Sequence, residues 1–497
     1  MPSILATDGY KFSMAQAGFP LRRETFYFCF RRGGWHYNPF DLVARVRALL
    51  PTVATQDEYA YLAANNYRLT EAMRQAIRGD LEIRAIPQGA WFGDQEPILS
   101  VTGPSFLVSW LETQLTWLNY PIQLATWLER TKGTDDEDTP IRVVCDEHER
   151  IVLETLEAVK KVRPIERDAH YAERTLEAAR GLVGALDGGD VDLRLIEGGM
   201  RAALCMEHHS MVLEACKAVG LSRTSNVHAA RELELVPSGT AGHEHTQRCM
   251  SDRAAFQSYL DRVCGLVSCL SDTFGTLRSG LPETVRIASD HPDRDFLFRL
   301  DSGDRPAYFH VCANTFARAG ITNVRINVAG DMDATSIAEL EALRKLVRWE
   351  PNRLSYMVGG GLTAQTLPTK LTRSRVAAVY KLSQSGTEPT MKLGDDDGLG
   401  KRSVPGNPVT WRRIRGEGPI GIIGQAGEAP PDNYIVMSDN PEAAEILRVV
   451  AAHPRRIDGE LRWGEHPIGY HLSPATRRLV ERIQRGLRAG SVRSEPA

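Results

Sequence analysis

The segment Arg299-Leu300-Asp301-Ser302-Gly303-Asp304 carries the residue types that a site for a phosphorylated sugar needs. It directly follows the apolar run Phe296-Leu297-Phe298, which is typical of a buried strand. A guanidinium can bind phosphate, carboxylates can bind sugar hydroxyls or a metal ion, and a glycine lets the backbone approach a ligand closely. We therefore take this segment as a candidate site for a sugar, its phosphates or a metal ion.

Two further segments could contact phosphoryl groups. Gly359-Gly360-Gly361 precedes a helix-like stretch, so its backbone amides and the positive end of the helix could bind a phosphate. Gly239-Thr240-Ala241-Gly242-His243 leads into another helix-like stretch and could present the imidazole to a phosphoryl group. His243 and His245 diverge on a helix, which argues against zinc. Each segment alone could equally be an ordinary turn or helix cap.

The elements that would position these residues recur between positions 190 and 385. Six apolar, strand-like runs are each followed by a polar or small loop and a helix-like stretch: 191–196, 233–236, 266–270, 296–300, 324–328 and 354–358. This repeat predicts parallel strands with helical crossovers, and six units favour a closed or nearly closed α/β barrel. The residues on its loops would share one mouth: Asp272, Arg299, Asp301, Asp304, Asp331, Asp333 and Gly359 to Gly361.

The apolar period of positions 334–349 predicts a helix, with Ser336 and Glu339 spaced as a capping box near its start. Residues 106–112 and 474–487 also have a helical pattern, and the acidic stretch 131–138 is typical of a linker or an exposed loop. This acidic stretch gives the first expected boundary between structural units.

Composition excludes several classes of protein. The 497 residues are 42% hydrophobic and 25% charged with a formal net charge of -3, which is typical of a globular protein and gives no electrostatic case for nucleic acid or an anionic membrane as the main partner. The start lacks the pattern of a signal peptide, and no long apolar stretch predicts a membrane helix, so we expect a cytoplasmic protein. Eight scattered cysteines without a Cys-x-x-Cys pair indicate reduced thiols.

The motifs together resemble the nicotinate and nicotinamide phosphoribosyltransferases and follow the order of that family from residue 4 to about 415. The motifs that carry the resemblance are Thr7-Asp8-Gly9-Tyr10-Lys11, Gly103-Pro104 followed by Leu111-Glu112-Thr113, Arg223-Thr224-Ser225-Asn226, Gly239 to His243, Arg299 to Asp304, Gly359 to Gly361, Tyr380-Lys381-Leu382, and Met391-Lys392-Leu393 with Lys401-Arg402-Ser403.

The resemblance implies an enzyme that transfers the ribosyl phosphate of phosphoribosyl pyrophosphate to a pyridine nitrogen and releases pyrophosphate. It also implies Mg2+ and coupling to ATP hydrolysis through a phosphorylated histidine, which would be His243, with His245 as the alternative. The implied fold is an irregular TIM-like α/β barrel (136–385) plus an α+β domain built from residues 1–135 and 386–497. A homodimer with shared active sites is implied, with Tyr10 and Arg31 or Arg32 in the neighbour's site.

The expected roles come from the resemblance, and the residue types found fit them. Carboxylates such as Asp301 and Asp272 would stabilise the positive charge that develops at the anomeric carbon. The residues expected to bind substrates are Tyr10, Arg201, Ser225, Arg299, Asp304, Gly330, Asp331, Gly360, Gly361, Lys381, Lys392 and Arg402. The metal ligands are not assigned.

The identity of the base is the open question. Ser225 matches a position at which the nicotinamide enzymes have an aspartate, which favours nicotinate and a role in NAD biosynthesis. Gly198 and Ala202 replace the family's ring-stacking aromatic and second arginine, so another base stays open, with Tyr10 as a substitute stacking residue. The alternatives are a nicotinamide enzyme, a barrel lyase with Lys381 as its Schiff-base nucleophile, and a non-catalytic ligand-binding relative.

Overall fold

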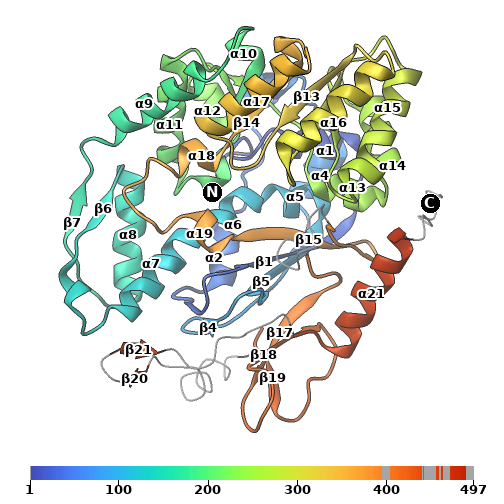
Figure 1. The fold of residues 1–497 in the computed structure, drawn as a ribbon. Coiled ribbons are helices and arrows are strands. Elements are labelled where there is room, and N and C mark those ends of the chain that lie inside the picture. The colour runs from blue at the N-terminus through green and yellow to red at the C-terminus, as the bar shows by residue number, and fades with distance from the viewer. Residues whose placement is uncertain are drawn as a thin grey trace.

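The computed structural model describes residues 2–393, 403–438, 440, 455–457, 460–462 and 471–488. Two sheets dominate it: a parallel sheet of seven strands and an antiparallel sheet of five strands (Figure 1). A smaller three-stranded sheet and the helix α21 lie beyond the antiparallel sheet.

The parallel sheet has the order β10-β9-β8-β14-β13-β12-β11 and is curled into a half-barrel. Its strands are β8 (Leu195–Glu197), β9 (Arg223–Thr224), β10 (Val236–Pro237), β11 (Val267–Leu270), β12 (Phe296–Leu300), β13 (Val324–Val328) and β14 (Leu354–Val358). All of its neighbouring strands pair in parallel. The expected α/β class with helical crossovers is confirmed, and the barrel is open, with β10 and β11 at the two ends of the sheet.

The convex face of this sheet packs against helices. The helices are α11 (Met206–Ala218), α12 (Val227–Glu232), α14 (Asp252–Arg262), α15 (Leu281–Asp290), α16 (Arg305–Arg318) and α17 (Ala334–Leu346). Because side chains alternate along a strand, Phe296, Phe298 and Leu300 point into this core, while Leu297 and Arg299 point to the concave side. The concave side is therefore left for the site.

The antiparallel sheet combines segments far apart in the chain. Its order is β16-β15-β1-β5-β3, with β1 (Arg23–Cys29), β3 (Glu82–Ala85), β5 (Leu99–Pro104), β15 (Val379–Ser385) and β16 (Glu388–Pro389). Lys381 lies on β15, which pairs antiparallel with β1. The lysine is therefore not on a barrel strand, and the lyase alternative loses that premise.

The remaining elements surround these two sheets. The N-terminal helices are α1 (Tyr10–Ala17), α2 (Leu42–Ala48), α3 (Gln56–Ala64), α4 (Glu71–Ile77), α5 (Ser105–Trp110), α6 (Glu112–Trp117) and α7 (Asn119–Arg130). Next come β6 (Ile141–Val143), α8 (Asp146–Ala158), β7 (Ile165–Arg167), α9 (Tyr171–Gly184) and α10 (Val191–Arg194); β2 (His36–Tyr37) pairs with β4 (Trp91–Phe92). Short helices near the site are α13 (His243–Cys249), α18 (Gly360–Thr363) and α19 (Arg373–Val376). The C-terminal elements are β17 (Pro408–Arg413), β18 (Gly421–Gln425), β19 (Tyr434–Val436), β20 (Arg455–Ile457), β21 (Glu460–Arg462) and α21 (Pro474–Arg488).

Three expectations about local structure are wrong. The run 191–196 begins as helix α10 and becomes a strand only at Leu195. The run 233–236 forms only the short strand β10. Helix α17 is capped by Asp333, whose carboxylate accepts the backbone N–H of Ser336, so Ser336 is not the cap. Among the described helices, none is long and apolar enough to cross a membrane.

Candidate active site

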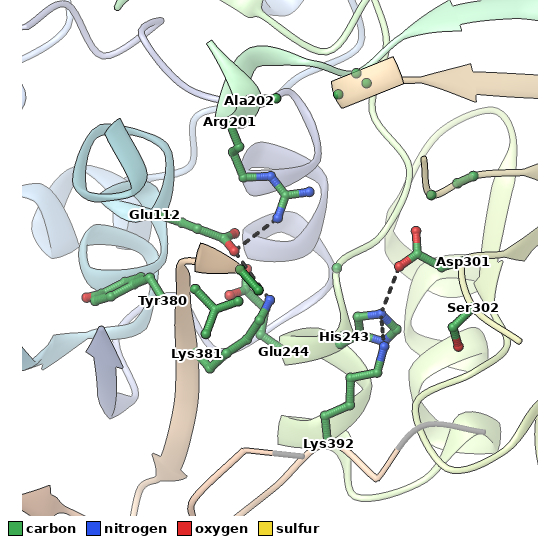
Figure 2. Close-up of a pocket in the computed structure, with 18 of the residues that line it drawn as sticks. Glu112, Arg201, Ala202, His243, Glu244, Asp301, Ser302, Tyr380, Lys381 and Lys392 are labelled. Carbon is green, nitrogen blue, oxygen red and sulfur yellow. Dashed lines mark hydrogen bonds and ion pairs between the residues drawn. The ribbon is translucent and has the colours of Figure 1, made fainter. Parts of the chain in front are cut away.

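A cavity of about 600 Å³ lies between the carboxyl ends of the parallel strands and strand β15. Figure 2 shows two groups of side chains in it: Glu112, Arg201 and Lys381 on one side, and His243, Asp301 and Lys392 on the other. The loops after β8, β12, β13 and β14 contribute to its wall, as expected for parallel strands whose carboxyl ends meet at one edge.

His243 begins helix α13 and is held on both ring nitrogens. Its Nδ1 lies 3.0 Å from the hydroxyl of Thr273, and its Nε2 lies 2.8 Å from the ammonium of Lys392. Because an ammonium can only donate, Nε2 accepts and the ring proton is assigned to Nδ1, which donates to Thr273. Burial, and then the charge of Lys392, lower the pKa of His243, so the imidazole is neutral and its Nε2 lone pair faces the cavity.

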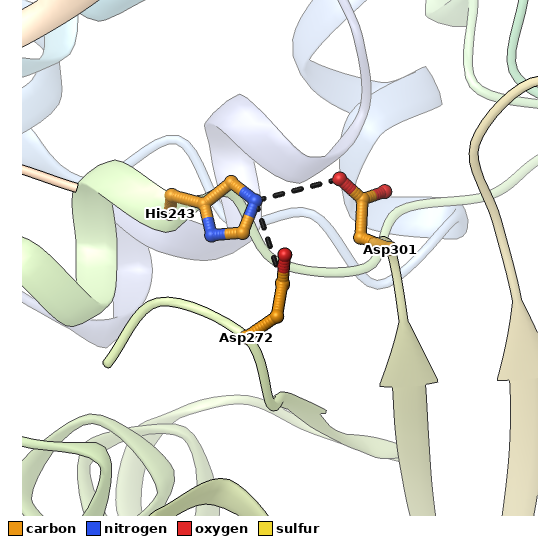
Figure 3. A group of neighbouring side chains, drawn as sticks. All are labelled: His243, Asp272 and Asp301. Atoms are coloured by element: carbon orange, nitrogen blue, oxygen red, sulfur yellow. Dashed lines mark hydrogen bonds and ion pairs between the residues drawn. The ribbon is translucent and has the colours of Figure 1, made fainter. Parts of the chain in front are cut away.

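Two carboxylates lie beside this nitrogen (Figure 3). Asp301, at the end of β12, places Oδ2 3.4 Å from Nε2 of His243, and Asp272, after β11, places Oδ1 3.6 Å away. Burial opposes ionisation of both, but the guanidinium of Arg299, 2.6 Å from Asp301, holds the pKa of that carboxyl well below its usual value. Lys392, 3.0 Å from Asp272, likewise lowers the pKa of Asp272. Both side chains are anions at neutral pH.

The same two carboxylates are suited to a metal ion. One ligand atom from each of His243, Asp272 and Asp301 lies within 4.8 Å of the others, and no other such group occurs among the described residues. Oδ1 of Asp272 is buried and accepts no hydrogen bond. Ionised carboxylate oxygens are the protein ligands that Mg2+ prefers, so the residues present fit this ion.

Cations crowd the other side of the cavity. The guanidinium of Arg201 lies 3.1 Å from Glu112, and the ammonium of Lys381 lies 3.6 Å from the same carboxylate. Arg31, Arg32 and Arg373 also line this side of the cavity. We call the side formed by Arg31, Arg32, Arg201, Arg373 and Lys381 the cationic wall. Burial, together with neighbouring arginines, lowers the pKa of Lys381 to about 8 and that of Arg373 to about 10. An anion with more than one charge would relieve this crowding.

The glycine run contributes space to the cavity. Gly359 and Gly360 line it, as do Gly330 and Asp331 from the loop after β13. Gly361 stands behind the wall, where an added Cβ would overlap the carbonyl oxygen of Met332. The helix that begins here, α18, is a single turn, so the contribution expected from the positive end of a helix is small at this point.

Several expected site residues lie outside the cavity. Asp304 is exposed and caps α16 by accepting the N–H of Ala307. Ser225 is buried behind the wall and donates to Asp8 over 2.6 Å. His245 is buried against α14, with Nε2 2.7 Å from Ser258. Arg402 lies outside the described residues.

Tyr10, Arg31 and Arg32 line the cavity of the same chain that carries His243. Their contribution to a neighbouring subunit's site stays a prediction. The roles assigned to the other lining residues remain predictions: His243, Asp301, Arg201, Arg299, Gly330, Asp331, Gly360, Lys381 and Lys392 line the cavity, with Asp272 directly behind His243.

Sequence reasoning missed four residues of the site. Glu112 and Glu244 anchor the cations, Thr273 holds the histidine ring, and Arg373 lines the cationic wall. Glu112 belongs to one of the motifs that carry the resemblance and Glu244 directly follows His243, so both could be suspected from the sequence. Arg373 lies in none of those motifs.

Comparisons with known proteins find nicotinate phosphoribosyltransferases. A nicotinate phosphoribosyltransferase of Bacillus subtilis is 34% identical over 265 residues, which cover 52% of this chain and 49% of that protein. The match thus spans about half the length of that relative. A bovine nicotinate phosphoribosyltransferase is 25% identical over 407 residues, which cover 76% of this chain and 67% of that protein. No protein-family model matches the chain.

The fold also has solved counterparts. The crystal structure of a nicotinate phosphoribosyltransferase from Porphyromonas gingivalis has a TM-score of 0.56 at 19% identity and covers 81% of this chain and 96% of its own. At that identity the likeness concerns the fold, and it matches the architecture of Figure 1.

Proposed function

We propose that this chain, a homologue of the nicotinate phosphoribosyltransferases, transfers the ribosyl phosphate of phosphoribosyl pyrophosphate to nicotinate, giving nicotinate mononucleotide and pyrophosphate for NAD biosynthesis. The observation that carries the proposal is the cavity itself, in which a cationic wall faces a neutral histidine flanked by two ionised carboxylates. One side suits polyanionic substrates, and the other suits phosphoryl and ribosyl transfer.

The cationic wall would bind the phosphates. Arg201, Arg373 and Lys381 line the same cavity, so we expect them to share one polyanion, and Lys392 extends the positive charge to the histidine side. Backbone amides of Gly359 and Gly360 would add uncharged donors. Guanidinium groups bind phosphate oxygens in pairs, which would orient the sugar as well as hold it.

In the transfer step the pyridine nitrogen forms a bond to the anomeric carbon as the bond from that carbon to the pyrophosphate oxygen breaks. Positive charge develops on the sugar, and an ionised carboxylate nearby stabilises it. Asp301 is ionised and reaches the cavity, so it is the residue we assign to this role. When bound, Mg2+ would neutralise charge on the phosphates, and Asp272 and Asp301 would hold it.

ATP coupling would act through His243. Its neutral Nε2 would attack the γ-phosphorus of ATP as the bond to ADP breaks, and later transfer of the phosphoryl group to water would restore the ring. Thr273 keeps the proton on Nδ1, which leaves Nε2 as the nucleophile. His245, the alternative, is buried away from the cavity.

Nicotinate fits the cavity better than nicotinamide does. Positively charged side chains outnumber carboxylates on the wall near Arg201, and a pyridine carboxylate would add a favourable charge there. Met357 lies against Gly198, where an added Cβ would come within 2.8 Å of its Cγ. Tyr10 and Tyr380 both line the cavity, and Tyr10 is the aromatic residue that we expect to stack on the base.

A homodimer and a cytoplasmic location complete the proposal. Sedimentation equilibrium of the purified chain would measure the first, and fractionation of cells that express it would measure the second.

The decisive experiment compares nicotinate with nicotinamide as acceptors, with and without ATP, in the wild type and in His243→Ala. We expect nicotinate mononucleotide as the product and strong ATP stimulation in the wild type only. Full ATP stimulation in His243→Ala would refute the phosphohistidine, and absence of product under all conditions would favour a non-catalytic relative. Borohydride trapping of a carbonyl substrate on Lys381 would instead support the lyase.

A further inference from the structure

A lysine buried behind the cavity wall connects the two sides of the site. Lys11, on α1, has a side chain with no solvent exposure, and its ammonium lies 2.6 Å from Glu112 and 2.8 Å from Glu244. Glu112 begins α6 and Glu244 belongs to α13, so one ammonium joins three helices. Ser109 donates a further hydrogen bond to Glu244 over 2.6 Å.

Each of these carboxylates also reaches the site. The second oxygen of Glu112 accepts from Arg201 over 3.1 Å and lies 3.6 Å from Lys381. Glu244 directly follows His243 at the start of α13. Lys11 therefore contacts Arg201 and Lys381 indirectly through Glu112. It also contacts Glu244, the residue next to His243 in the chain.

Charge balance explains what Lys11 does there. A buried carboxylate is stable as an anion only when cations compensate it. Lys11, Arg201 and Lys381 hold the pKa of Glu112 well below its usual value, although burial raises it. If Lys11 were neutral, Glu112 and Glu244 would need other cations, and Arg201 and Lys381 are the ones within reach of Glu112.

We infer that Lys11 is a positioning residue, which compensates Glu112 and Glu244 so that Arg201 and Lys381 stay available to a substrate polyanion and helix α13 stays in place. The inference rests on the proposed function, because that function supplies the polyanion. Lys11 itself contacts no substrate, since its side chain is fully buried.

The test measures binding of inorganic pyrophosphate with magnesium chloride to the full chain by calorimetry, alongside thermal unfolding. We expect Lys11→Met to weaken this affinity about tenfold or more. Glu112 then loses one of its cations and pairs more strongly with Arg201 and Lys381, which would otherwise bind pyrophosphate. Lys11→Arg should bind within about threefold of the wild type, since it keeps the charge. Arg194→Met is the matched control, since it breaks an equally buried ion pair with Glu341, and neither residue lines the cavity.

A double variant separates positioning from folding. Lys11→Met/Glu244→Gln removes one charge of each sign, so it should fold even if Lys11→Met does not. Positioning predicts that pyrophosphate binding stays weak, because Glu112 still draws on Arg201 and Lys381. Recovery of wild-type affinity in this variant would overturn the inference.

The two proposals fail separately. If the wild type binds pyrophosphate, and the variants follow the expected order, but no nicotinate mononucleotide forms, the proposed function is wrong and the role of Lys11 stands. If the wild type is active and Lys11→Met binds pyrophosphate as tightly as the wild type, the role of Lys11 is wrong and the function stands.

Discussion

The ammonium of Lys392 lies 2.8 Å from Nε2 of His243 and 3.0 Å from a carboxylate oxygen of Asp272. Burial and this lysine together lower the pKa of the histidine, and the ammonium sits where the charge of a transferred phosphoryl group would appear. Its hydrogen bond can pass from the nitrogen to a phosphate oxygen as the nitrogen attacks, since both are acceptors.

Replacing Lys392 by Met should raise the pKa of His243. The pKa of this ring is lowered by burial and by Lys392, while Asp272 and Asp301 favour its protonated form. Without the lysine, the ring would take up a proton at higher pH and lose its free Nε2. The acid limb of the rate of phosphoryl transfer from ATP should therefore move to higher pH.

The measurement is the pH dependence of acid-labile phosphate on the protein in a single turnover. Lys345→Met, on the exposed side of α17, controls for loss of a lysine elsewhere. The midpoint pH of the acid limb is compared between variants independently of the maximal rate of phosphoryl transfer. That maximal rate will fall in Lys392→Met, because Lys392 is also a phosphate ligand in the proposal. An acid limb that stays in place, or moves to lower pH, would contradict the assignment.

Lys381 should set an alkaline limit on substrate capture. Burial lowers its pKa to about 8, so this side chain loses its charge as the pH rises through that value. The kcat/KM for phosphoribosyl pyrophosphate, which reports on the free enzyme, should fall above about pH 8. Lys381→Arg keeps its charge across this range, so its kcat/KM should stay level to about pH 9. A wild-type profile that is flat across this range would speak against this role.

Local sequence predicts the core strands well, because their signal is local. Strands β12, β13 and β14 coincide with the apolar runs read from the sequence, since each run is buried on its convex face and ends at polar or glycine residues. Positions 191–194 alternate apolar and charged residues, as a half-buried strand would, but form α10. One reason is local, since Asp190 caps the helix, and the other is distant in the chain, since Arg194 is buried in an ion pair with Glu341.

The strand pattern predicts only those site residues that follow strands, whereas His243, Lys381 and Lys392 are expected from the motifs of the resemblance. Asp301 ends the strand-like run of β12 and Asp331 follows that of β13, so the sequence places both at a shared mouth, and both line the cavity. The contact of Lys11 with Glu112, by contrast, joins residues 101 positions apart. Long-range pairs of this kind leave no periodic signal in the sequence, so the role of Lys11 can be recognised only from the folded structure.

Gly361→Ala should destabilise the protein, because an added Cβ would overlap the carbonyl oxygen of Met332. Overpacking against backbone lowers the free energy of unfolding by about 1–3 kcal/mol. Gly181→Ala is the opposite case, since the new methyl group on α9 would lie 4.0 Å from Ala334. It should stabilise the helix by about 1 kcal/mol. Denaturant unfolding of both variants measures the difference, and equal stabilities would contradict the packing described for the glycine run.

Asp301 and Asp304 belong to one loop, yet the structure gives them different roles. Gly303 between them has a φ of 81°, a conformation that favours glycine, and the chain turns there, so that Asp301 faces the cavity and Asp304 caps α16. Asp301→Asn keeps the shape and removes the charge that would stabilise the ribosyl transition state, so kcat should fall by about 10²–10³-fold. Asp304→Asn keeps a good helix cap, so stability should change by no more than about 0.5 kcal/mol and kcat should not change. Steady-state kinetics and unfolding of the two variants decide the matter: a large fall in kcat for Asp304→Asn would return that residue to the site, and near-normal turnover in Asp301→Asn would remove Asp301 from it.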